Sequence, residues 1–175
     1  MKKLTSEELE TFVTALIKEC QENQLSCRRQ IAYILATVEW ETAKTFQPVV
    51  ESYWEKNPDN YNKITHPEYY PYYGRGYVQL TWKQNYKKFS DIVGKDLVKN
   101  PDLVLNPEIA LKILVYGFKH GSFSGAKLEN YITKNSCDYK HSRKCINGND
   151  KACDIASLAE KWEQILLYKR PDISL

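Results

Sequence analysis

Two glutamates and a nearby aromatic segment are the residues of this chain best suited to chemistry. Glu41 ends a helix-like stretch, and Glu51 follows ten positions later. Downstream, the fifteen residues from Tyr72 to Tyr86 contain two glycines, five aromatic rings and four uncharged hydrogen-bonding side chains. A pair of carboxylates can cut a glycosidic bond, because one protonates the leaving oxygen while the other handles water or the sugar cation. The rings and amides of the segment suit a sugar polymer as substrate.

Each glutamate also has a structural interpretation. Glu41 lies beside Trp40 at the end of an apolar helix face, which would leave its carboxyl partly desolvated, as a general acid requires. The alternative is a solvated helix charge. Glu51 lies between two valines and two aromatic residues, and its alternative role is a salt bridge. Glu55 and Glu68 come from the same stretch and are further candidates for the second carboxylate.

Polar side chains of the aromatic segment have two interpretations each. Thr81 could hold an attacking water, and it could also cap the following helix. Gln79 and Asn85 could bind sugar hydroxyls or acetamido groups, or bond to the local backbone. Arg75 lies between two glycines, so its side chain could reach a carboxylate elsewhere in the fold. The run from 69 to 73, rich in tyrosine, is either a stacking platform or part of the core.

The rest of the sequence offers a polar turn near its end and no recognisable metal or cofactor motif. Asn147-Gly148 is a strong turn pair. The three histidines are scattered, and no CxxC spacing occurs. The motifs of serine hydrolases, P-loop proteins and zinc proteases are also missing from the sequence. We therefore expect neither a metal nor another cofactor.

Apolar periodicity and capping signals predict a mostly α-helical fold with a minor β element. Residues 5–8 form a capping box before an apolar stripe that runs to Cys20. Residues 42–71 lack clear periodicity and predict one long ordered loop with at most a short helical turn. Residues 72–80 predict a hairpin or an irregular extended segment. Further helices are expected over residues 27–40, 82–93, 107–121, 127–133 and 155–168.

Size and charge fit one compact domain over residues 1–175. The chain is 42% hydrophobic, with a net charge of +3 and a pI near 8.5. Its basic residues are spread out, which argues against nucleic-acid binding and allows a weak attraction to an anionic cell wall. No apolar run is long enough for a membrane span, and no secretory signal is visible. We expect a monomer, made in the cytoplasm, that reaches the cell wall by a separate route.

The five cysteines are an odd number. Without a signal peptide, free thiols are the expected state. Cys20 and Cys27 could still pair across the turn between the first two helices.

Three blocks of sequence together resemble glycoside hydrolase family 19, which includes plant-type chitinases and many phage endolysins. The blocks are Ala36 to Thr42, Tyr73 to Tyr86 and Arg143 to Gly148, and the resemblance spans residues 30–165. It implies a lysozyme-like, two-lobed helical domain with a substrate cleft. It also implies an inverting mechanism on β-1,4-linked polymers that contain N-acetylglucosamine.

The resemblance further implies roles for individual residues. Glu41 is similar to the general acid, Glu51 to the general base, and Thr81 to the hydroxyl that holds the nucleophilic water. An inverting enzyme needs its carboxyl groups about 6.5–9.5 Å apart. The implied substrate-binding residues are Tyr73, Arg75, Gln79, Asn85, Tyr86, Arg143 and Asn147.

Departures from the family bear on the substrate. Trp40 stands where the family often has histidine, and the stretch from Glu41 to Glu51 is shorter than in plant chitinases. The extra loops and disulfide pattern of the plant enzymes are also missing. These differences favour bacterial peptidoglycan, cleaved as by an endolysin, with chitin as the alternative substrate. A non-catalytic glycan-binding module is the alternative of another class, although binding alone does not need two acids.

Overall fold

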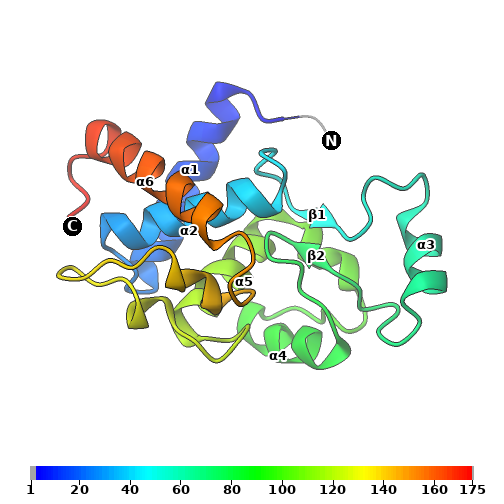
Figure 1. Cartoon of the computed structure of the whole chain (residues 1–175). Helices are drawn as coiled ribbons and strands as arrows, with labels where there is room; N and C mark the ends of the chain where they lie inside the picture. Colours follow the sequence, from blue (N-terminus) through cyan, green and yellow to red (C-terminus); the bar gives the residue numbers. More distant parts are fainter. Residues whose placement is uncertain (1–2, 175) are drawn as a thin grey trace.

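The computed structural model describes residues 3–174, which fold mainly as helices (Figure 1). Two short strands, β1 (Val49–Val50) and β2 (Arg75–Gly76), form the sheet. The predicted mostly α fold with a minor β element is therefore confirmed. The α-helices are α1 (Ser6–Glu22), α2 (Arg28–Glu41), α3 (Pro58–Thr65), α4 (Lys83–Val93), α5 (Pro107–His120) and α6 (Ala152–Lys169). Short 3₁₀ helices are η1 (Pro101–Leu105), η2 (Leu128–Asn130) and η3 (His141–Cys145).

Local capping residues set the starts of α1 and α5 where the sequence predicts them. The Thr5 hydroxyl accepts from the Glu8 amide at 3.2 Å, and the Glu8 carboxylate accepts from the Thr5 amide at 2.7 Å, so the capping box of α1 is confirmed. Asn106 caps α5 by accepting from two backbone amides, and Gly121 ends that helix in the left-handed conformation.

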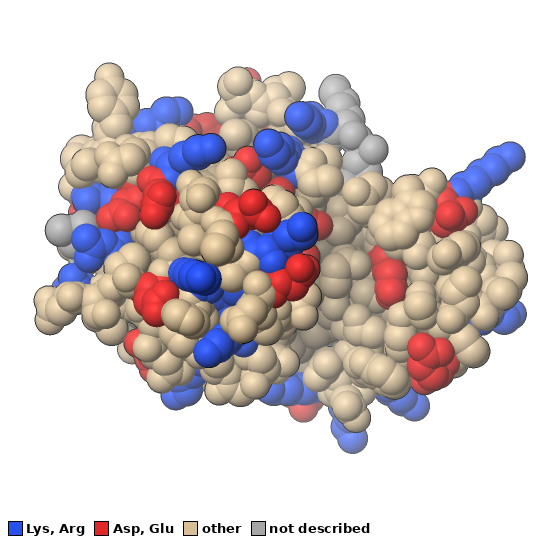
Figure 2. All heavy atoms as spheres, viewed as in Figure 1, with Lys and Arg blue, Asp and Glu red and all other residues tan. Residues whose placement is uncertain are grey.

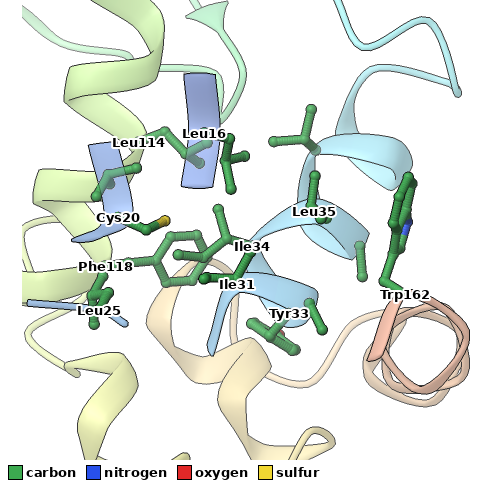
Figure 3. Close-up of a cluster of buried hydrophobic side chains, with 14 of the residues drawn as sticks. Leu16, Cys20, Leu25, Ile31, Tyr33, Ile34, Leu35, Leu114, Phe118 and Trp162 are labelled. Atoms are coloured by element: carbon green, nitrogen blue, oxygen red, sulfur yellow. The ribbon is translucent and has the colours of Figure 1, made fainter. Parts of the chain in front are cut away.

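The main hydrophobic cluster surrounds α2, which packs against α1, α5 and α6. Burial of each large aliphatic side chain there contributes about 1.5–3 kcal/mol. Because α2 is fixed on several sides, its C-terminal residue Glu41 is held on a rigid element. Figure 3 shows side chains of α1 and α5 gathered around those of α2, among them Leu16, Cys20, Ile31, Ile34, Leu114 and Phe118.

A second, smaller cluster lies beneath α4 and η1. Tyr86 and Phe89 of α4 pack there with Val104 of η1 and Ile113 of α5. The next residue of α5, Leu114, belongs to the main cluster. Helix α5 therefore contributes to both clusters and connects the two parts of the core.

The stretch from 42 to 71 is more structured than predicted. It contains β1 and the eight-residue helix α3 in addition to loops. The start of α3 is local: Asn57 accepts a hydrogen bond from the Asn60 amide at 3.1 Å, and Pro58 occupies the first turn. This helix lacks an apolar stripe, because Asn62 is its only buried residue. Periodicity therefore could not reveal it.

The expected hairpin over residues 72–80 is only partly present. Strand β2 pairs antiparallel with β1, placing Val49 opposite Gly76 and Val50 opposite Arg75, and one isolated bridge joins Arg75 to Leu80. Gly76 adopts a φ of +89°, and an added Cβ atom would lie 3.0 Å from the Val104 side chain. Glycine is thus required where β2 meets the second cluster.

Two further expectations about helices need correction, and the expectation of free thiols is confirmed for Cys20 and Cys27. Thr81 does not cap α4; the N-cap is Trp82, without a side-chain cap bond. The helix expected over 127–133 is reduced to η2, whereas the last predicted helix is present as α6. Cys20 and Cys27 are unpaired. Within residues 3–174, no helix combines the length and the apolar character needed to cross a bilayer.

Candidate active site

A groove separates the larger helical body from a smaller lobe formed by residues 51–73, which carry α3. Figure 2, in the same view as Figure 1, shows this hollowed band with acidic side chains on both of its sides. Glu41 ends α2 on the body, and Glu51 follows β1 at the start of the small lobe. The two candidate carboxylates thus come from different structural supports.

Arg143 binds Glu41. Its Nη1 atom donates to Oε1 of Glu41 at 2.6 Å, and its Nε atom donates to the Asp150 carbonyl at 2.9 Å. The Arg143 side chain is 3% exposed, whereas that of Glu41 is 20% exposed. A charged partner therefore holds Glu41, in place of the purely apolar surroundings expected from the sequence. The Arg143 to Gly148 block and the end of α2 are thus brought together, a contact that the sequence did not predict, and the substrate-binding role of Arg143 stays a prediction.

Glu51 is held by donors on both carboxylate oxygens. The Gly74 amide donates to Oε2 at 2.7 Å, and the Tyr69 hydroxyl donates to Oε1 at 3.0 Å. His66 Nε2 lies 3.9 Å from the same Oε1 atom. Burial, together with the bond to Glu51, raises the pKa of Tyr69 above its usual value, so its hydroxyl stays protonated as a donor at neutral pH.

The side chain of Arg75, the first residue of β2, is buried in the interior. Its Nε atom pairs with Asp102 at 2.8 Å, and its Nη1 atom donates to the Tyr73 carbonyl and the Tyr86 hydroxyl, each at 3.1 Å. The guanidinium carbon also lies 3.7 Å from the centroid of the Tyr73 ring. Arg75 does reach a distant carboxylate, as predicted, but that carboxylate is Asp102.

Three residues of the predicted binding set are buried in this cluster. Tyr86 is 0% exposed, Arg75 3% and Tyr73 4%. Side chains this deep support the segment that contains β2, and their predicted contact with a sugar stays a prediction. Tyr73 also donates to Asp59 of α3 at 3.1 Å, so the cluster joins the small lobe to β2.

Thr81, Gln79 and Asn85 are partly exposed beside this cluster. Thr81 donates to the Gln79 carbonyl at 2.9 Å, and Asn85 donates to the Thr81 carbonyl at 2.8 Å. Gln79 donates to the Val49 carbonyl of β1 at 3.1 Å. Each side chain bonds to backbone, and the substrate-binding roles of all three stay predictions.

The remaining candidates lie nearer the surface. Asn147 is exposed, and its backbone amide donates to the Arg143 carbonyl at 3.0 Å. Glu68 is 53% exposed and lies 3.7 Å from His66 Nδ1. Glu55 is partly exposed. Of the three candidates for the second carboxylate, Glu51 has the most extensive network of donors.

Sequence reasoning missed two residues around Glu51. Tyr69 was considered only as part of a tyrosine run, although its hydroxyl binds the carboxylate. Trp82 is 45% exposed, packs edge-on against Tyr69 at 5.2 Å, and adopts a φ of +74°. A large residue at positive φ is strained. Such strain often marks a functional site, but it becomes visible only once the backbone conformation is known.

The family model for chitinase class I, glycoside hydrolase family 19, matches residues 25–121. This range contains both candidate glutamates and the aromatic segment. The chain belongs to glycoside hydrolase family 19. The lysozyme-like fold expected for that family is also confirmed, because a crystal structure of a bacterial family 19 chitinase matches with a TM-score of 0.66 at 26% identity, covering 89% of this chain and 85% of that chain.

Several curated relatives of this family 19 chain are plant proteins. Chitinase 11 of rice (Oryza sativa subsp. japonica) is 36% identical over 95 residues, which cover 54% of this chain and 37% of the rice protein. The chain thus spans little more than a third of that relative's length. Inactive chitinase-like protein 1 of Hevea brasiliensis is 36% identical over 63 residues, covering 35% of this chain and 20% of that protein. Membership of the family is therefore compatible with either activity or its loss.

Proposed function

We propose that this chain is an inverting glycoside hydrolase that cleaves β-1,4 bonds in chitin-type polymers of N-acetylglucosamine. One observation carries the proposal: a family 19 match spans Glu41 and Glu51, and each carboxylate has its own polar support. Relatives named as chitinases favour chitin over the peptidoglycan that the sequence departures suggested.

The family match gives the two carboxylates different roles, and the contacts of each are compatible with its role. Arg143 engages Oε1 of Glu41, which leaves Oε2 to carry the proton for the leaving oxygen. Once that proton has moved, the guanidinium stabilises the carboxylate that forms. Gly74 and Tyr69 donate to the two oxygens of Glu51 and so fix the position of its carboxylate. Held in this position, the Glu51 carboxylate can take a proton from the attacking water.

Hydrolysis of defined substrates tests this proposal. The purified protein would be incubated with chitin oligomers and with bacterial peptidoglycan, and the new reducing ends would be identified by mass spectrometry. Early products would be examined by proton NMR, where the α-anomer is expected from an inverting enzyme. Initial formation of the β-anomer would contradict the inverting mechanism. Cleavage of peptidoglycan alone would favour the endolysin-type substrate.

Matched variants assign the carboxylates. Glu41→Gln and Glu51→Gln should each abolish hydrolysis while leaving the fold and oligomer binding intact. Glu55→Gln and Glu68→Gln serve as controls from the same stretch and should retain turnover. If the unmodified chain binds oligomers without hydrolysing them, the alternative of a glycan-binding module is supported. The relative in Hevea that is named as inactive gives this alternative a precedent.

A further inference from the structure

The buried residue of α3 is bonded to the turn that carries Glu51. Asn62 is 0% exposed, and its Nδ2 atom donates to the Glu51 carbonyl at 3.0 Å. Its Oδ1 atom accepts from the Ser52 hydroxyl, also at 3.0 Å. Ser52 has a φ of +60°, a conformation that L-residues rarely adopt without support. One amide therefore holds two consecutive residues in a strained turn.

The same turn fixes the carboxylate. The Glu51 amide donates to the Gly74 carbonyl at 2.7 Å, and the Gly74 amide returns a bond to Oε2 of Glu51 at 2.7 Å. The backbone of Glu51 is thus held between Gly74 on one side and Asn62 on the other. A shift of this backbone would displace the carboxylate from its donors.

Helix α3 does not need Asn62 for its own attachment. Its start is capped by Asn57, and Asp59 accepts hydrogen bonds from the hydroxyls of Tyr70 and Tyr73, at 3.2 and 3.1 Å. These contacts tie the helix to the segment that leads into β2. The bonds made by Asn62 go instead to the residues at and after Glu51.

We propose that Asn62 is a positioning residue, which acts through the Glu51–Ser52 turn to hold the Glu51 carboxylate in place. The inference rests on the proposed role of Glu51 as general base. Small displacements of a catalytic group can lower turnover about 100-fold, and a positioning defect affects kcat more than substrate binding.

Kinetics of three variants test the inference in an active enzyme. Asn62→Ala removes both hydrogen bonds, Asn62→Asp keeps the shape but loses the donor to Glu51, and Ser52→Ala removes a single bond. We expect kcat to fall about tenfold or more for the two Asn62 variants and less for Ser52→Ala, with little change in KM. Gln30→Ala is the matched control, because Gln30 is a buried amide of α2 that donates to the Ile132 carbonyl at 2.9 Å.

A second readout does not depend on activity. The Gly74 amide is protected by Oε2 of Glu51, so its hydrogen exchange reports where the carboxylate lies. Exchange at Gly74 should quicken in Asn62→Asp and stay unchanged in Gln30→Ala. Unchanged exchange at Gly74, or a loss of kcat no larger than that of Gln30→Ala, would overturn the inference. Should the unmodified chain cleave neither polymer, the proposed function fails, and Gly74 exchange alone decides whether Asn62 positions Glu51.

Discussion

Arg143 and Glu41 are 102 residues apart in the chain and are joined by a hydrogen-bonded ion pair of 2.6 Å. The arginine side chain is almost fully buried, whereas the glutamate faces partly outward. The pair fixes the end of α2 to η3, which contains Arg143. It also places a permanent positive charge beside the proposed acid.

Arg143→Ala should lower kcat on chitin oligomers about 10- to 100-fold, because hydrogen bonds to charged groups contribute about 1.5–3 kcal/mol. Arg143→Lys should recover part of this loss, since it restores the charge without the forked geometry. Thermal unfolding measured alongside separates the kinetic effect from instability. Full activity in Arg143→Ala would show that the pair has no catalytic role.

Tyr69→Phe should lower kcat about tenfold with little change in KM, because it deletes one charge-assisted donor to Glu51. Tyr70→Phe is the control, since its hydroxyl bonds to Asp59. Steady-state kinetics of the two variants provide the comparison. Equal kcat values would discount the contact between Tyr69 and Glu51.

Trp82→Gly should weaken oligosaccharide binding several-fold, because this partly exposed ring packs against Tyr69, the donor to Glu51, and can stack on a sugar. Glycine also relieves the strain of the positive φ, so the unfolding temperature should not fall. Calorimetric titration with chitin oligomers measures the affinity. Tyr168→Ala, on the 88% exposed tyrosine of α6, is the control, and an equal loss there would make the effect unspecific.

Alkaline pH should unfold the protein. Burial raises the pKa of Tyr73 and of Tyr86 to about 12, against about 10 in an unfolded chain. Neutral tyrosine is therefore favoured by the folded state, so this stability is complete below about pH 10 and is lost as the pH rises toward about 12. Urea unfolding across this range should show a steep decline, and Tyr86→Phe should flatten it. An equally steep decline in the variant would assign the effect to other groups.

Much of the helical framework is predictable from sequence because its signals are local. The capping box before α1 and the Asn106–Gly121 boundaries of α5 depend on neighbouring residues. Helix α3 is not predicted beyond a short helical turn, because its packing depends on contacts with residues that are distant in the sequence. Its position depends on a buried asparagine and on tyrosines that approach from the segment before β2.

The candidate site was predictable in its residue types and less so in their partners. The resemblance located Glu41, Glu51 and Arg143. The partner of Arg75 is Asp102 because η1 packs against β2. The sequence alone does not predict this packing, and so it does not predict the partner. The same holds for Tyr86, whose position in α4 gave no indication that it would be fully enclosed.

The contribution of α5 to two hydrophobic clusters has a consequence for how this fold can evolve. Helix α5 connects the packing beneath α4 with the packing around α2, whereas the residues from 51 to 73 bury few large apolar side chains in either cluster. Insertions in that stretch can therefore reshape one wall of the groove at small cost to folding. The substrate range of this fold can therefore change through the small lobe of residues 51–73, while the helical body keeps its sequence.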